Sequence, residues 1–145
     1  MFSSAVPWNP GVNQARCYHW HSAPGPNCLC GLNAYYTLGE AVKQAHLRPA
    51  WSRGRSIIGV VAGKGAVRLH RQGFRCQEAQ VLALYTPKGK SRPEQQITKI
   101  SEKYQVQVYE SGKQLQEAVS QLPGVMTMDL SLVEDLPIED SDYTK

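Results

Sequence analysis

Long apolar runs are missing from this sequence of 145 residues, and no stretch of about 18 apolar residues predicts a membrane-spanning helix. The first sixteen residues, MFSSAVPWNPGVNQAR, lack a basic segment followed by an apolar one, so no secretory signal is predicted. We therefore expect a cytoplasmic protein, in which disulfide bonds are rare. The length fits one domain, which we expect over residues 1–128, followed by an acidic and flexible tail over residues 129–145.

Acidic residues are scarce in the first two thirds of the chain. Residues 1–92 contain twelve Lys and Arg but only two acids, Glu40 and Glu78, which gives a net charge of +10 with His neutral. Residues 93–145 contain four Lys and ten acids, which gives −6. A basic body predicts an anionic partner, and the acidic tail predicts a separate role, such as competing for the basic body or contacting another protein. The alternative is a soluble protein whose halves simply differ in charge.

Regular apolar spacing is absent from residues 1–34, which are rich in Pro, Gly, Asn and Cys and which we expect to form loops. The next segments carry clearer patterns. Residues 35–47 predict a short helix, and residues 56–71 predict either a hairpin at Ala62–Gly65 or one long strand with a glycine bend. The apolar run over residues 74–85 fits a strand or a helix, and a strand is favoured at its start.

The C-terminal half has the spacing of a helix–strand–helix unit. Residues 91–104 predict a helix capped by Ser91, residues 106–109 alternate like a strand, and residues 112–122 predict a helix capped by Ser111. The expected fold class is α+β, with a small antiparallel sheet over residues 56–85 and N-terminal loops held by zinc.

The scarce cysteines are clustered, because three of the four lie with two histidines in residues 17–30, CYHWHSAPGPNCLC. Zinc is held by four N or S ligands, usually supplied by loops. The spacing C-x3-H-x6-C-x-C predicts a structural zinc site formed by Cys17, His21, Cys28 and Cys30. His19 is a competing ligand. Gly31 is expected to let backbone N–H groups turn toward a thiolate.

Other states of the cysteines are also open at the level of sequence. Cys17 and Cys28 could form a disulfide, or the thiols could be packed in the core or take a redox or iron–sulfur role. A catalytic zinc ion would need an open coordination position, for example if His21 did not bind. Cys76 is expected to be a buried structural thiol.

Two stretches, WNPGVNQARC…HSAPGPNCLCGLNAY and IIGVVAGKGAVRLHRQGFRCQEAQVLAL, resemble a family of small uncharacterised proteins from bacteria and their phages. The resemblance covers about residues 8–85. It implies that the family's Cys and His positions fall on the four candidate zinc ligands. Its second block falls on the segment that contains His70, Gly73, Phe74, Arg75 and Glu78. The chain departs from the family where the resemblance implies Ala at Cys76 and an aromatic residue at Lys64.

Two polar constellations are candidates for binding or reaction. His70, Arg75 and Glu78 could bind an anion or transfer a proton, or Arg75 and Glu78 could be a surface ion pair. A basic face could follow a nucleic-acid backbone while its tryptophan stacks on an unpaired base. We define this basic face as Arg48, Trp51, Arg53, Arg55, Lys64, Arg68 and Arg71. A regular strand would place Lys64, Ala66, Arg68 and His70 on one side.

The favoured interpretation is a non-enzymatic, zinc-stabilised module that binds nucleic acid, or a protein of a nucleoprotein complex, through this basic face. A first alternative is an accessory or regulatory subunit that uses the acidic tail. A second is a small enzyme that uses His70, Arg75 and Glu78.

Overall fold

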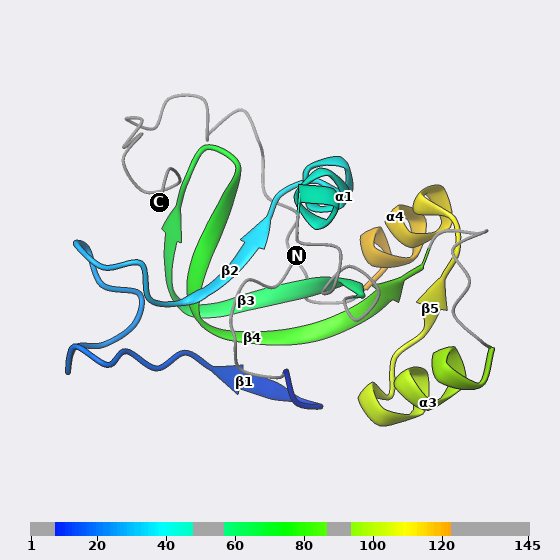
Figure 1. The fold of residues 1–145 in the computed structure, drawn as a ribbon, viewed down its shortest axis with the longest axis horizontal. Coiled ribbons are helices and arrows are strands. Elements are labelled where there is room, and N and C mark those ends of the chain that lie inside the picture. Colours follow the sequence, from blue (N-terminus) through cyan, green and yellow to red (C-terminus); the bar gives the residue numbers. More distant parts are fainter. Residues whose placement is uncertain (1–7, 48–56, 87–93, 123–145) are drawn as a thin grey trace.

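A long, strongly curved hairpin organises the molecule (Figure 1). The computed structural model describes residues 8–47, 57–86 and 94–122, which form a five-stranded sheet and three helices. The hairpin consists of β3 (Ile58–Leu69) and β4 (Gly73–Tyr85), which pair antiparallel along almost their whole length. The α+β class predicted from the sequence is confirmed.

β4 pairs with every other strand of the sheet. β3 follows one of its edges, and three short strands line the other edge one after another. β2 (Leu32–Tyr35) and β1 (Val12–Gln14) pair antiparallel with β4, while β5 (Val108–Tyr109) pairs parallel with its end. The prediction that residues 1–34 form only loops is therefore wrong. Strands of three and four residues are too short to show alternation, and their order comes from the long partner strand.

The hairpin turn lies at residues 70–72, where the backbone N–H of His70 donates to the Gly73 carbonyl at 2.8 Å. The glycine segment before it is therefore a bend within one long strand, which was the second of the two predicted alternatives. Pairing with β4 shifts between Lys64 and Val67, and Gly65 has a φ of +74°. That backbone conformation favours glycine.

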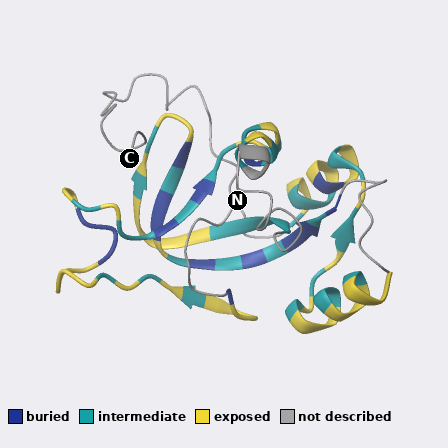
Figure 2. Ribbon diagram, viewed as in Figure 1, coloured by how far each residue is buried: buried dark blue, intermediate teal, exposed yellow. Residues whose placement is uncertain are grey.

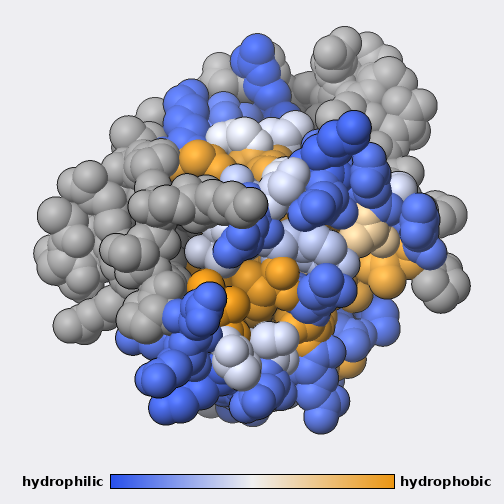
Figure 3. Space-filling model, turned by 90° about the vertical axis from the view of Figure 1, so that its right-hand side faces the viewer, coloured by the Kyte–Doolittle hydropathy of each residue, from blue (hydrophilic) through white to orange (hydrophobic). Residues whose placement is uncertain are grey.

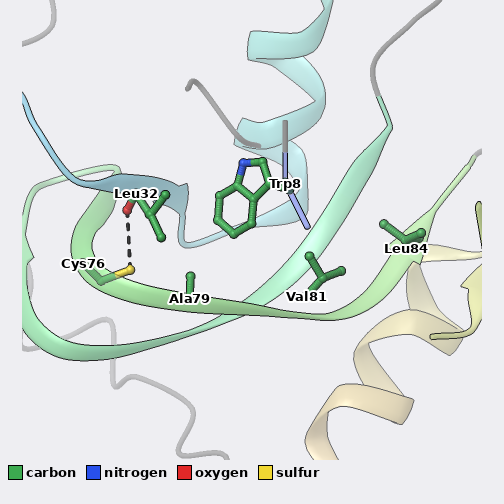
Figure 4. Packing of buried hydrophobic residues seen from close by; sticks show 6 residues of the cluster. All are labelled: Trp8, Leu32, Cys76, Ala79, Val81 and Leu84. Carbon is green, nitrogen blue, oxygen red and sulfur yellow. Dashed lines mark hydrogen bonds between the residues drawn. The ribbon is translucent and has the colours of Figure 1, made fainter. Parts of the chain in front are cut away.

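The core lies against one face of β4, over which the indole of Trp8 packs (Figures 2 and 4). Trp8 and Leu32 cover the buried side chains of Cys76, Ala79, Val81 and Leu84, and Phe74 packs against the same cluster. The contributing positions of β4 are spaced two, three, two and three residues apart. This irregular spacing falls between the strand and helix periods, which explains why the sequence pattern fitted both.

The helices flank the sheet. α1 (Leu38–Leu47) follows β2 directly, and the Thr37 side chain accepts the N–H of Glu40 at 3.2 Å in its first turn. α3 (Glu94–Tyr104) and α4 (Gly112–Ser120) lie on either side of β5 in the chain, so the predicted helix–strand–helix order is confirmed. We call residues 94–122 the C-terminal unit. Its surface is mostly hydrophilic, with apolar atoms showing between the polar ones (Figure 3).

The predicted helix caps have different outcomes. Ser111 has the extended backbone of a cap residue, but its side chain makes no capping hydrogen bond. Its carbonyl instead accepts the N–H of Leu115, a side chain that is buried against the sheet. Ser91 and the tail over residues 129–145 lie outside the described residues. Within the described ranges, no helix has both the length and the apolar character needed to cross a membrane.

Candidate metal centre

The four predicted metal ligands lie in the segment between β1 and β2, which we call the cysteine loop (residues 15–31). The loop leaves the sheet at Ala15, whose N–H donates to the Gln77 carbonyl at 2.7 Å, and it returns at Leu32. Both ends are therefore fixed on β4. The intervening chain projects beside the bend of the hairpin (Figure 1), and its return brings Cys28 and Cys30 close to Cys17 and His21.

The ligand atoms of Cys17, His21, Cys28 and Cys30 all lie within 4.8 Å of one another. The Cys17 Sγ is 3.3 Å from His21 Nε2 and 3.6 Å from Cys28 Sγ. A tetrahedral zinc ion with its usual bond lengths holds neighbouring ligand atoms about 3.6–3.8 Å apart. A disulfide would need about 2.05 Å between the two sulfurs, and all four cysteines are free thiols. The residues therefore lie close enough to hold a metal ion.

The imidazole of His21 is oriented for this role by a backbone carbonyl. Its Nδ1 lies 3.0 Å from the Ser22 oxygen, and donation there leaves Nε2 free to face the thiolates. Metal-bound histidines commonly have their second nitrogen held in this way. The hydrogen bond to Ser22 raises the pKa of His21. His19 lies outside the cluster, with its ring stacked at 6.5 Å from the His21 ring.

Backbone N–H groups point at the sulfurs. The N–H of His19 donates to Cys17 Sγ at 3.4 Å, and the N–H of Gly25 donates to Cys30 Sγ at 3.3 Å. The N–H of Cys30 stabilises the Cys28 thiolate and is the main reason that the Cys28 pKa falls to about 6. Desolvation raises the pKa of Cys17. The lowered pKa favours the thiolate form of Cys28, which is the form that binds a metal ion.

Gly25 is a functional position that the sequence reasoning missed. A Cβ there would lie 2.2 Å from Cε1 of the His21 ring, so any larger residue would displace a ligand. Gly31 was the glycine expected to let backbone N–H groups turn toward a thiolate. The N–H that donates to Cys30 Sγ belongs to Gly25. Gly31 has a φ of +125°, and a Cβ added there would lie 3.1 Å from the Arg75 Cβ, so a glycine at this position lets the loop rejoin the sheet.

The side chain of Arg75, on β4, connects the cysteine loop to the hairpin through hydrogen bonds. Its side chain is only 4% exposed, its Nη1 donates to the Cys28 carbonyl, and its Nε donates to His70 Nε2 at 2.9 Å. A buried guanidinium with these contacts positions the loop. The alternative of an Arg75–Glu78 surface pair is therefore wrong.

Glu78 lies elsewhere, opposite Lys64 in the strand register, and it accepts a hydrogen bond from Gln14 Nε2 at 3.4 Å. The structure therefore brings together only two of the three side chains of the expected polar site. His70 pairs with Arg75, and Glu78 contacts other partners.

The expected stripe of basic residues on β3 is not regular. The extra residue between Lys64 and Val67 breaks the alternation, so Lys64 faces Glu78 across the strands while Arg68 faces Arg75. Arg68 Nε donates to the Pro24 carbonyl of the cysteine loop at 3.4 Å. Arg71 is exposed in the hairpin turn. The other members of the basic face, Arg48, Trp51, Arg53 and Arg55, lie outside the described residues.

Cys76 is separate from the metal cluster. Its side chain is 1% exposed, and its thiol donates to the Leu32 carbonyl at 3.5 Å (Figure 4). Burial raises its pKa to about 11. The prediction of a buried structural thiol is confirmed.

Two exposed aromatic side chains on the cysteine loop were not singled out from the sequence. Tyr18 is 91% exposed and Trp20 is 98% exposed. A signal was available, because residues 18–20 lie between two predicted ligands, and such a short connection cannot reach the core.

No family model, curated protein or solved structure matches this chain. The function of the centre is therefore inferred from its own geometry.

Proposed function

We propose that the chain is a non-enzymatic binding module whose cysteine loop is held by a structural zinc ion and which binds nucleic acid through its basic face. Zinc would act by fixing the loop. Structural zinc sites use four protein ligands, whereas catalytic sites keep one position open. The observation that carries the proposal is the set of four candidate ligand atoms within 4.8 Å of one another, which is the number that a closed tetrahedral site requires.

The donor set supports zinc over other metals. Three thiolates and one imidazole are typical of structural zinc, whereas iron–sulfur clusters are mostly held by four cysteines. Oxygen ligands, which calcium and magnesium require, are missing from the cluster. The N–H groups that face the sulfurs further favour thiolates over thiols.

Charge supports an anionic partner. Residues 1–92 have a net charge of +10, and the first acid in the chain is Glu40. Lys64 and Arg71 are both exposed, so they are available to phosphate groups. Contacts between Lys or Arg and phosphates release counterions and make binding dependent on salt.

Elemental mass spectrometry of the purified, untagged protein tests the metal. We expect one zinc ion per chain, and we expect a chelator to unfold the protein as followed by circular dichroism. A metal-free protein whose stability does not change with chelator would contradict a structural zinc site.

Fluorescence anisotropy with labelled oligonucleotides tests the partner. We expect affinity to fall steeply between about 50 and 200 mM salt. Lys64→Glu and Arg71→Glu should each weaken binding more than Lys99→Glu, a matched charge reversal on the exposed surface of α3. An absence of binding by the wild type at low salt would contradict the nucleic-acid part of the proposal and leave the metal centre untouched.

A further inference from the structure

The segment between the first two candidate ligands, Cys17 and His21, carries two aromatic rings that are almost fully exposed. Tyr18 and Trp20 are 91% and 98% exposed, so their side chains contribute almost nothing to the core. Both lie between Cys17 and His21, whose ligand atoms are 3.3 Å apart. The two ligands therefore close a tight loop that holds these rings at its tip.

The backbone of Trp20 is strained. Its φ of +61° lies in the left-handed region, which bulky side chains rarely adopt and which glycine adopts freely. Both neighbouring residues are held by hydrogen bonds, since the N–H of His19 donates to Cys17 Sγ and Nδ1 of His21 contacts the Ser22 carbonyl. A large exposed residue in a strained position is typical of functional sites, where binding compensates for the strain.

We infer that Tyr18 and Trp20 form a stacking platform for unpaired bases of a single-stranded nucleic acid, an inference that rests on the proposed function and identifies the form of nucleic acid. Aromatic rings that are free on their faces stack on bases of any sequence, and paired bases in a duplex are not accessible to them.

Charge around the platform fits a polyanion. Exposed Arg16 precedes the first ligand, and Arg68 contacts the same loop through the Pro24 carbonyl. No carboxylate occurs in the first 39 residues. His19 lies between the two rings, and Arg16 and Ser22 lie just outside the flanking Cys17 and His21. Leu29 is an exposed aliphatic side chain of the same loop, so its contribution is tested separately below. The combination favours phosphates beside stacked bases.

Anisotropy with a labelled oligothymidylate and with a duplex of the same length tests the inference. Trp20→Ala and Tyr18→Ala should each lower affinity for the single strand about tenfold, within the range measured for loss of one stacked base. Duplex affinity should change less than twofold. Trp20→Phe should keep most of the single-strand affinity, because a ring is retained. Zinc content is measured for every variant, so that loss of the metal is not mistaken for loss of stacking.

Leu29→Ala is the matched control. Leu29 is 56% exposed and lies between two ligands of the same loop, but it has no ring. Equal losses for Leu29→Ala and Trp20→Ala, or equal losses on single strand and duplex, would overturn the stacking platform. Unchanged affinity in both aromatic variants, with weakened binding in Arg71→Glu, would also overturn it while the proposed function stands. A wild type that binds neither oligonucleotide would refute the proposed function itself, and with it this inference.

Discussion

The cysteine loop and the C-terminal unit lie at opposite ends of the molecule (Figure 1), and different forces hold them there. The C-terminal unit is attached by apolar packing. Leu115 is buried against the sheet, and Ile100, Tyr104, Val106 and Val108 pack against the core cluster. In the cysteine loop, only the short Ala23–Gly25 segment is buried. Its contacts are mostly polar and include hydrogen bonds to Gln77, Arg68 and Arg75 and the mutual approach of the four candidate ligands.

This contrast separates two ways of stabilising a small domain. Apolar burial contributes about 25 cal/mol per Å² without any ligand, so packing on the sheet stabilises the C-terminal unit without a metal ion. A loop of seventeen residues with little buried apolar area cannot offset the conformational entropy lost on ordering. Metal binding would supply that free energy, because an ion that binds only the folded loop stabilises it.

The largest expected effect is the loss of a ligand. Cys28→Ser should cost about 3 kcal/mol or more, since structural zinc sites contribute about 10–16 kcal/mol of apparent binding energy. In hydrogen exchange, amides of β1 and β2 should lose protection first, and the C-terminal unit should keep protection longer. Leu29→Ala serves as the control. Unchanged protection of β1 and β2 in Cys28→Ser would abolish the contrast between the two ends.

The second effect tests the other end. Leu115 is 2% exposed, so Leu115→Ala removes buried apolar volume and should lower the free energy of unfolding by about 2–4 kcal/mol. Thermal unfolding measures this, with Glu117→Ala on the exposed side of α4 as a control that should change stability by about 0.5 kcal/mol or less. Zinc content should stay at one per chain. A loss of zinc in Leu115→Ala would show that the two ends are coupled.

The contrast also explains what the sequence could predict of the fold. Helix and strand periods in a sequence arise from apolar packing. These periods are present in the C-terminal unit, so the order α3, β5, α4 was predicted correctly. β1 and β2 were missed because segments of three and four residues are too short for a period to identify them, although β2 alternates in burial. Their places are set by long-range pairing with β4, which such short segments do not reveal. The irregular spacing of the core residues on β4 arises from shifts in its pairing with β3.

The candidate site divides in the same way. The cluster of Cys17, His21, Cys28 and Cys30 was predicted, because metal binding restricts the residue types and the four are close in sequence. Gly25 was missed and Arg75 was predicted in a different role, because a close approach to the His21 ring and a hydrogen bond to the Cys28 carbonyl are properties of the folded loop. The resemblance of residues 8–85 to a family of bacterial and phage proteins stays a prediction.

A third test concerns the connection between loop and hairpin. Arg75→Met keeps most of the buried volume but removes the donors to the Cys28 carbonyl and to His70. Leaving those acceptors unsatisfied should cost about 1–3 kcal/mol. Competition with a zinc-binding dye measures the cost at the metal, and Arg75→Lys should not restore it, since an ammonium group cannot reproduce the two-pronged geometry. Unchanged zinc affinity in Arg75→Met would mean that the loop positions its ligands without the hairpin.

A fourth test uses pH to distinguish the ionisation of the core thiol, Cys76, from that of the cysteines in the candidate metal cluster. Burial raises the Cys76 pKa from 9.0 to about 11, so its contribution to stability is complete below pH 9 and is lost as pH rises toward 11. The wild type should therefore lose about 1–2 kcal/mol more than Cys76→Ala between pH 9 and 11 in denaturant titrations. Tyrosine ionisation affects both proteins equally. Parallel curves for the two proteins would mean that Cys76 ionises without a penalty and is not sealed in the core.

The smallest expected effect is the most specific to the cysteine loop. Trp20→Gly removes a left-handed backbone strain of about 1–2 kcal/mol, and the greater freedom of glycine in the unfolded chain offsets about 0.4–1 kcal/mol of that gain. The side chain is 98% exposed, so its removal forfeits almost no packing. Denaturant unfolding with zinc bound should thus give equal or slightly higher stability, whereas Leu115→Ala at the other end is strongly destabilising. A loss of more than about 1 kcal/mol would show that the indole stabilises the loop and that its exposure needs no functional explanation. If Trp20→Gly keeps its stability but binds single strands more weakly, the strained Trp20 serves recognition. A residue with only a structural role could be replaced by glycine without any loss of binding.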